Sequence, residues 1–224
     1  MRGWFVAGTD TGVGKTYCCE LLIGQLVAEA KNVAAFKPVA SGATVLDGKV
    51  RNDDALRLMR AANSGLHYED INPYCFADPI SPHWAAAKAG MIIDIPRLAI
   101  HIHAKARGAD FTIVEGVGGW YAPLTENETA ADLAQALGLP VILVVGLRVG
   151  CLNHALLTAD AIVSSGALLA GWIGNVIDPD YGNVAETEAY LTPRLGAPYL
   201  GIVPYGPSDA ALKAGLRLEL GKLK

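Results

Sequence analysis

The sequence has few charged residues and few cysteines, and each scarcity excludes a class of function. Only 18% of the 224 residues are charged, the formal net charge is −4, and no block of lysine or arginine occurs. Because proteins that bind nucleic acid present a basic patch to phosphates, no nucleic-acid partner is predicted. The four cysteines, Cys18, Cys19, Cys75 and Cys151, lack paired Cys-x-x-Cys spacing, which argues against a disulfide framework and against a zinc site.

Long apolar segments are also lacking. The N-terminal apolar run, GWFVA, has five residues and leads directly into a glycine- and threonine-rich loop, without the longer segment and cleavage site of a signal peptide. The longest later run, LPVILVVGL at 139–147, is too short to span a bilayer. We therefore expect no membrane partner and a cytoplasmic location.

What the sequence does have is apolar material in short runs. With 52% hydrophobic residues, the chain has enough for an extensive core, and its length suits one domain, residues 1–224. Six runs are typical of fully buried strands: 3–8, 32–38, 110–116, 140–146, 169–177 and 198–203. Stretches with helical spacing lie between them: 14–30, 53–63, 94–107, 129–137, 153–165 and 184–195. This alternation predicts an α/β fold, with a mostly parallel β-sheet and helices on both faces.

Two segments depart from the alternation. Residues 64–93 are rich in proline and aromatic side chains, and such an insertion is more often a wall of a site than a core element. The C-terminal GLRLELGKLK, residues 215–224, alternates leucine with polar residues. It is compatible with a short strand or with an amphipathic end, and the pattern does not separate the two.

The loop GTDTGVGKT at residues 8–16 joins the first predicted strand to the first predicted helix. A glycine-rich turn there directs backbone N–H groups and the positive end of the helix dipole toward a phosphate. Lys15 would reach the terminal phosphates and the Thr16 hydroxyl a Mg²⁺ ion. Five residues separate Gly8 from Gly14, and Thr9 stands where the first glycine of the usual motif would be. The order of strand, loop and helix favours a P-loop NTPase fold over a glycine-rich turn with an incidental lysine.

Further polar residues stand at predicted strand ends and at a helix start. Glu115 follows the apolar FTIV and precedes glycines, which favours a magnesium ligand over a solvated carboxylate. Lys37 and Ser41 lie at the carboxyl end of the second strand, the edge where parallel sheets bind ligands. In RNDDALRL, Asp53 is compatible with a helix N-cap, and Asp54 is a candidate for a second metal carboxylate.

Taken together, several stretches closely resemble the dethiobiotin synthetase family. They occur in order between residue 3 and about residue 178: GTDTGVGKT, FKPVASG, RNDDAL, NPYCFADPISPH, VEGVGGWYAPL and LPVILVVGLRVGCLNHALLT. The five-residue spacing in the loop also matches this family. The resemblance implies a P-loop homodimer that uses Mg²⁺ and ATP to make a cyclic urea from 7,8-diaminononanoate and CO₂, supplied as bicarbonate.

The resemblance also implies a reaction course. One amine of the substrate forms a carbamate with CO₂, and a carbamate oxygen takes the γ-phosphoryl group of ATP. The second amine then closes the ring with loss of phosphate. Phosphoryl transfer of this kind needs positioning and charge stabilisation more than a protein nucleophile.

The resemblance assigns residues to each part of this chemistry. Lys15 and Lys37 would be catalytic. ATP would be bound by Gly8, Thr9, Thr11, Gly12, Val13, Gly14, Lys15, Thr16, Asn175 and Pro204. The substrate would be bound by Thr11, Lys37, Ser41 and Gly118, together with Gly150, Cys151, Leu152 and Asn153 from the other subunit. Mg²⁺ would be held by Thr16, Asp54 and Glu115.

Two alternative functions come from the same class of fold. Partition and septum-site ATPases switch partners instead of converting a metabolite, but they usually carry a second lysine early in the loop, and none precedes Gly14 here. Their membrane-binding members add a basic amphipathic C-terminal helix, for which the alternating leucines are unsuited. A related amidoligase would normally need a glutaminase domain, for which this length leaves no room.

Overall fold

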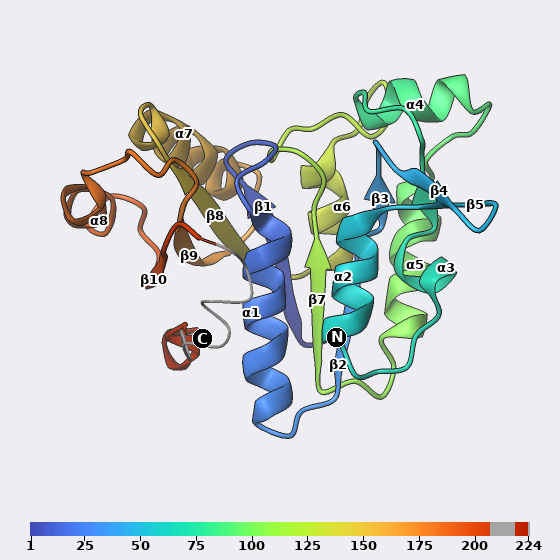
Figure 1. The fold of residues 1–224 in the computed structure, drawn as a ribbon, viewed down its shortest axis with the longest axis horizontal. Coiled ribbons are helices and arrows are strands. Elements are labelled where there is room, and N and C mark those ends of the chain that lie inside the picture. Colours follow the sequence, from blue (N-terminus) through green and yellow to red (C-terminus); the bar gives the residue numbers. More distant parts are fainter. Residues whose placement is uncertain (207–217, 224) are drawn as a thin grey trace.

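The computed structural model describes residues 1–206 and 218–223, and a six-stranded parallel β-sheet forms its centre (Figure 1). The strand order is β10-β9-β8-β1-β7-β2, and every neighbouring pair is parallel. The strands are β1 (Gly3–Gly8), β2 (Val33–Phe36), β7 (Phe111–Glu115), β8 (Val141–Leu147), β9 (Leu169–Val176) and β10 (Tyr199–Val203). All six predicted strands are confirmed.

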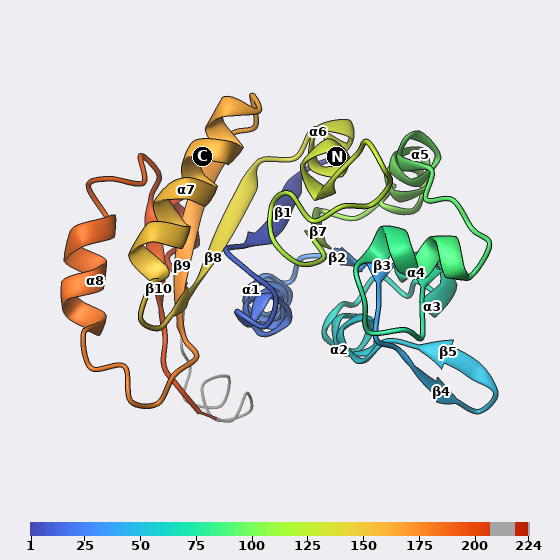
Figure 2. The ribbon, with the colours of Figure 1, turned by 90° about the horizontal axis from the view of Figure 1, so that it is seen from above.

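Helices cover both faces of this sheet, as the alternating pattern predicts (Figure 2). α1 (Lys15–Ala28) and α2 (Asp53–Ala61) lie on one face, and α5 (Ile95–Lys105), α6 (Ala130–Leu137) and α7 (Cys151–Ser164) lie on the other. α8 (Val184–Leu191) lies near the β10 edge. Successive residues of β1 point to opposite faces: Trp4 and Val6 pack in the cluster with α1, and Phe5 and Ala7 pack in the cluster on the other face.

Apart from α2, residues 39–93 hold short elements that the sequence pattern does not reveal. β3 (Val39–Ala40) pairs in parallel with β6 (Tyr74–Cys75), and β4 (Thr44–Leu46) forms an exposed hairpin with β5 (Lys49–Arg51). α3 (Tyr68–Ile71) and α4 (Pro82–Lys88) complete the region. Strands of two or three residues are too short to show any periodicity, which is why they escape prediction.

The described part of the predicted C-terminal tail contains a single turn of 3-10 helix, η1 (Leu220–Lys222), and no strand. Leu218 is buried against the α1 face of the sheet. The Gln25 side chain of α1 donates to the Leu218 carbonyl and accepts from its N–H. Residues 215–217 and 224 of that tail lie outside the described residues. No helix in the described ranges is long and apolar enough to cross a membrane.

Candidate active site

The P-loop owes its shape to left-handed glycines and to a side chain from β9, two strands away from β1 in the sheet. Gly12 and Gly14 have φ angles of +74° and +84°, values that residues with a side chain rarely adopt. Asn175, at the end of β9, donates its amide N–H to the Val13 carbonyl at 2.8 Å. A Cβ on Gly14 would lie 2.0 Å from that amide nitrogen. The contact therefore requires glycine at position 14.

The residues before the turn tie the loop to β1 and β8. The Thr9 N–H donates to the Val144 carbonyl at 3.0 Å, and the Gly146 N–H donates to the Thr9 hydroxyl at 3.5 Å. A Cβ on Gly8 would lie 2.7 Å from a methyl group of Val13. A threonine thus anchors the loop at the position where the usual motif has its first glycine.

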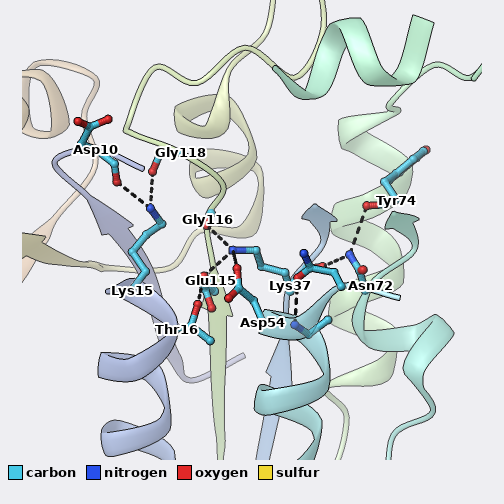
Figure 3. Close-up of polar contacts among 12 residues, drawn as sticks. Asp10, Lys15, Thr16, Lys37, Asp54, Asn72, Tyr74, Glu115, Gly116 and Gly118 are labelled. Carbon is cyan, nitrogen blue, oxygen red and sulfur yellow. Dashed lines mark hydrogen bonds and ion pairs between the residues drawn. The ribbon is translucent and has the colours of Figure 1, made fainter. Parts of the chain in front are cut away.

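Lys15 begins α1 and folds back over the loop. Its ammonium donates to the Asp10 carbonyl at 2.9 Å and to the Gly118 carbonyl at 2.7 Å (Figure 3). Burial, together with the nearby Lys37 ammonium, lowers the pKa of Lys15 from 10.5 to about 8. The side chain is held at the mouth of the loop with its charge poorly solvated.

A second lysine forms a buried charge cluster at the ends of β2 and β7. The Lys37 ammonium lies 2.5 Å from Glu115 Oε1 and 3.2 Å from Asp54 Oδ2 (Figure 3). The Thr16 hydroxyl donates to the same Glu115 oxygen at 2.9 Å. Glu115 is 1% exposed, so it is not a solvated carboxylate at a strand end.

The pKa shifts follow from these contacts. Burial alone would lower the pKa of Lys37, but the Glu115 and Asp54 carboxylates outweigh burial and raise the pKa. Burial alone would raise the pKa of Asp54, and the Lys37 ammonium and Thr16 hydroxyl lower it below its ordinary value. Both groups are therefore held in their charged forms.

Asp54 is positioned by the start of α2. The N-cap of this helix is Asn52, whose side chain accepts from the Ala55 N–H at 3.2 Å. Asp53 is exposed and is the first helical residue, so its prediction as the N-cap is wrong. Asparagine and aspartate cap helices by the same hydrogen bond, and the sequence alone does not decide between adjacent candidates.

These groups border a cavity of about 640 Å³. The predicted site residues that line it are Thr11, Gly12, Gly14, Lys15, Thr16, Lys37, Ser41, Asp54, Glu115 and Gly118. Residues 79–82 form part of its wall, as expected for the insertion. Lining residues that sequence reasoning missed are Tyr17, Ala40, Asn52, Arg57, Val117, Gly119 and Ala122.

Among the cavity-lining residues that sequence reasoning missed, Arg57 was the most recognisable from the sequence. It lies one helical turn after Asp54 on α2, at the spacing that places two side chains on the same helix face. Its guanidinium makes two hydrogen bonds to the Glu20 carboxylate of α1, one of them from Nε at 3.0 Å. The pair joins the two helices that carry Thr16 and Asp54.

Several predicted site residues do not line this cavity. Gly8, Thr9, Val13 and Asn175 support the loop from behind, and Pro204 is exposed after β10. Gly150, with a φ of +93°, precedes α7, so residues 150–153 do form a helix start as predicted. They are absent from the cavity lining of their own chain. An Arg148–Asp10 ion pair of 2.9 Å links the segment before α7 to the P-loop.

The oxygen atoms in the cluster suit a hard divalent cation. Thr16, Asp54 and Glu115 offer a hydroxyl and two carboxylates, the donor types that Mg²⁺ prefers. Glu115 Oε2 is buried and has no hydrogen-bond partner among the described residues. Such an orphaned carboxylate oxygen fits a metal ligand, because burying it without any partner is costly. Among the described residues, no group of three or more His, Cys, Asp or Glu side chains could hold a metal ion by itself.

Comparisons with known proteins agree with this geometry. The AAA domain family matches residues 2–210. The ATP-dependent dethiobiotin synthetases BioD of Aromatoleum aromaticum and Pseudomonas paraeruginosa are 45% and 46% identical, over 97% of this chain and 97% of each relative. The BioD protein of Cellvibrio japonicus is 42% identical over 99% of this chain and 97% of its own.

Similar solved structures belong to a different functional group. MinD of Aquifex aeolicus has a TM-score of 0.58 at 16% identity, covering 99% of this chain and 93% of its own. A ParA family ATPase of Chlorobium tepidum has a TM-score of 0.56 at 14% identity, covering 96% and 90%. At these identities the likeness shows the fold alone, and it confirms the predicted P-loop ATPase architecture.

Proposed function

The chain belongs to the ATP-dependent dethiobiotin synthetase family and is a ligase of biotin biosynthesis, and we propose that it catalyses ring closure at the cavity beside the P-loop. Its substrates in this proposal are 7,8-diaminononanoate, CO₂ or bicarbonate, and ATP. The relatives match over nearly the whole chain, whereas the partition and septum-site ATPases share only the fold. The switch-ATPase alternative is therefore supported by the fold alone.

The observation that carries the proposed site is the position of Lys37. Its ammonium is buried at the cavity wall and is held there by two carboxylates. Hydrolysis of a nucleotide by water needs no second buried ammonium, whereas an anionic acceptor oxygen does benefit from one. A carbamate, which carries its negative charge on oxygen, is such an acceptor.

The proposed reaction has three bond-forming steps. An amine nitrogen of the diamine attacks CO₂ and loses a proton, which gives the carbamate. A carbamate oxygen then attacks the γ-phosphorus of ATP, the bond to the bridging oxygen breaks, and ADP leaves. Finally the second amine attacks the carbamoyl carbon of the mixed anhydride, loses a proton and expels phosphate, which closes the cyclic urea.

Each lysine has a separate task in this scheme. Lys15 leaves the carbonyl groups of Asp10 and Gly118 to contact the terminal phosphates, where its charge offsets the charge that develops on the transferred group. Lys37 contacts the carbamate and its phosphorylated form. Thr11, Ser41 and Gly118, which also line the cavity, complete the contacts with the diamine and carbamate.

A magnesium ion would be held by Thr16, Asp54 and Glu115. When bound, Mg²⁺ supplies charge neutralisation for the β- and γ-phosphate oxygens. Thr16 and Glu115 are already within hydrogen-bond distance of each other. Asp54 lies within reach of the same lysine as Glu115, so the three oxygen donors need little rearrangement.

Nucleotide binding in the proposal uses the loop and the strands behind it. Residues 8–16 enclose the triphosphate, with α1 directing its N-terminus toward it. Asn175 and Pro204 contact the base. Asn175 retains its bond to the Val13 carbonyl through one amide hydrogen, which leaves a second hydrogen and one acceptor oxygen for adenine.

We further propose a cytoplasmic homodimer in which each chain acts as one domain, residues 1–224. Residues 150–153 of one subunit would bind the substrate carboxylate at the cavity of the other, through the N–H groups at the start of α7. Mixing two variants, Lys37→Met and Asn153→Asp, tests the shared site, because a carboxylate at position 153 should repel the substrate carboxylate at this helix start and leave that variant inactive. Re-associated dimers should regain roughly a quarter of the wild-type activity, because each mixed dimer has one intact site. No recovery after confirmed exchange of subunits would refute a shared site.

The function is tested by following dethiobiotin and ADP by mass spectrometry, with diamine, bicarbonate and MgATP present. Wild-type protein should form both in equal amounts and only when the diamine is present. Lys37→Met should lower dethiobiotin formation by about 100-fold or more. Lys88→Met, which removes an exposed lysine side chain of α4, is the matched control and should behave as wild type. ATP hydrolysis without dethiobiotin would refute the proposal.

A further inference from the structure

A chain of buried hydrogen bonds connects the 64–93 insertion to the main chain of Lys37. Asn72 is 3% exposed, and its side-chain amide donates to the Lys37 carbonyl at 2.6 Å and to the Tyr74 carbonyl at 3.2 Å (Figure 3). The Tyr68 hydroxyl donates to the Asn72 side-chain oxygen at 2.8 Å. Asn72 is therefore fully oriented, with both ends of its amide engaged.

The same hydroxyl reaches α2 on its other side. The backbone N–H of Asn52 donates to the Tyr68 oxygen at 2.7 Å. Asn52 is the N-cap of α2, and Asp54 stands two residues further on. Tyr68 thus joins the start of the helix that carries Asp54 to the residue that holds the Lys37 backbone.

These bonds close a ring around the reactive groups. On one side of the ring, the Lys37 ammonium lies 3.2 Å from the Asp54 carboxylate. On the other, Asn72 and Tyr68 connect the two main chains that carry those side chains. A lysine side chain has several rotatable bonds, so a contact of its ammonium group does not fix where its backbone lies. The ring fixes the main chains of both residues as well as the Lys37 ammonium and the Asp54 carboxylate.

The surroundings of Tyr68 keep this connection intact. Burial raises the pKa of the Tyr68 hydroxyl, so it remains protonated and donates to Asn72. The Arg51 guanidinium lies over the Tyr68 ring, 4.0 Å from its centre, and also pairs with Glu69 at 2.6 Å. The Lys37 N–H donates to the Ile71 carbonyl at 3.0 Å, so the insertion holds both main-chain polar groups of Lys37.

We propose that Tyr68 and Asn72 are positioning residues for the reaction, because their hydrogen bonds set the Lys37–Asp54 geometry at the cavity. The inference rests on the proposed function, which assigns Lys37 to the carbamate and Asp54 to Mg²⁺. Neither Tyr68 nor Asn72 lines the cavity, so they act through the residues that do. A small displacement of groups that stabilise a transition state lowers the rate more than it weakens nucleotide binding.

The test compares Tyr68→Phe with Tyr74→Phe. Each variant removes one tyrosine hydroxyl from the same insertion. Among the described residues, the Tyr74 hydroxyl accepts a hydrogen bond from the Asp94 N–H at 3.1 Å and is not part of the ring. Tyr68→Phe should lower kcat for dethiobiotin about tenfold or more, with KM for ATP changed less than about twofold. It should also lower the ratio of dethiobiotin to ADP, since a displaced Lys37 holds the carbamate poorly. Tyr74→Phe should retain the wild-type kcat and ratio.

A second variant tests the same ring through different atoms. Asn72→Leu, similar in shape, removes both the bond to Tyr68 and the bond to the Lys37 carbonyl, and it should reproduce the loss of kcat and of the product ratio in the fraction that is folded. Wild-type kcat and ratio in folded Tyr68→Phe or Asn72→Leu would overturn the inference. So would a loss confined to the amount of folded protein, with kcat per folded molecule unchanged.

The controls separate this inference from the function on which it rests. If wild-type protein makes dethiobiotin and Lys37→Met does not, a normal Tyr68→Phe enzyme overturns the positioning role alone. If wild-type protein makes no dethiobiotin, or Lys37→Met is fully active, the proposed function and the positioning role both fail.

Discussion

Lys15 should destabilise the protein in the absence of nucleotide, although the proposed reaction depends on it. The residue is 6% exposed, and the hydrogen-bond partners of its ammonium are the carbonyl groups of Asp10 and Gly118, with no carboxylate among them. A buried ammonium without a directly bonded anion is unfavourable, which is why its pKa falls to about 8. We therefore predict that Lys15→Met raises the free energy of unfolding while abolishing product formation.

The expected change in the free energy of unfolding follows from the pKa shift of Lys15. A decrease from 10.5 to about 8 corresponds to about 3 kcal/mol at neutral pH, at about 1.4 kcal/mol for each pH unit. Methionine removes that cost but also removes two hydrogen bonds to main-chain carbonyls, worth about 1 kcal/mol each. The net gain is about 1 kcal/mol, which is about 3 °C in Tm for a chain of this length.

The pH dependence provides a sharper test than the Tm alone. The unfolded chain keeps the Lys15 proton up to its ordinary pKa of 10.5, whereas the folded protein releases it from about pH 8. Between these values the unfolded state binds more protons, so raising the pH stabilises the folded wild-type protein relative to the variant. The advantage of Lys15→Met should be complete below pH 8, should disappear at about pH 9, where about 1 kcal/mol of the cost of burial has been relieved, and should be reversed at higher pH.

The assay is urea denaturation of both proteins without nucleotide, at pH 7.0 and pH 9.5. Titration of the other groups largely cancels in the difference between the two proteins. A variant less stable than wild type at pH 7.0, or a stability difference that does not shrink at pH 9.5, would refute the assignment of a strained, desolvated Lys15.

Three further predictions concern the charge cluster and the loop. Glu115→Gln should lower the free energy of unfolding by about 3 kcal/mol, measured by urea denaturation at pH 7, because it leaves the buried Lys37 ammonium with one carboxylate, itself partly exposed. A variant as stable as wild type would contradict the ion pair. Asp54→Asn should raise the Mg²⁺ concentration that gives half-maximal dethiobiotin formation by about tenfold, and an unchanged Mg²⁺ titration would remove Asp54 from the metal site. Gly14→Ala should weaken ATP binding, measured by calorimetry, and should cost at least about 1 kcal/mol of stability, because the residue has a positive φ and its Cβ would collide with the Asn175 amide. Normal ATP affinity in that variant would show that the Asn175 contact does not shape the loop.

The sheet and its helices follow directly from local pattern. A strand that is covered on both faces is a continuous apolar run, and all six of these runs became strands of the main sheet. Their order in the sheet does not follow from any one run. It depends on which crossovers pack on which face, a property of the whole chain that neither periodicity nor composition carries.

The site was predictable where chemistry is local. Lys15 and Thr16 are recognisable from their loop, and Glu115 from its place at the end of a buried strand. The ring through Asn72 and Tyr68 was not predictable, because it joins residues up to 35 positions apart through side chains that occur singly in an irregular segment. Nothing in their spacing distinguishes them from other polar residues of that insertion.

The fold and the proposed specificity of this molecule depend on different parts of the chain. Parallel sheets of this kind bind ligands at the carboxyl ends of their strands, and proteins at 14% and 16% identity share the fold. What selects a carbamate over water as the phosphoryl acceptor, in the proposed reaction, is the short stretch around Lys37. Beyond the end of β2, the main chain of that stretch is held by the irregular insertion, through the β3–β6 pairing and the Asn72 side chain. The main sheet contributes the Glu115 carboxylate that contacts the Lys37 ammonium. Specificity for the acceptor should therefore respond to changes at Tyr68 and Asn72 that leave the sheet, the P-loop and ATP affinity unaltered.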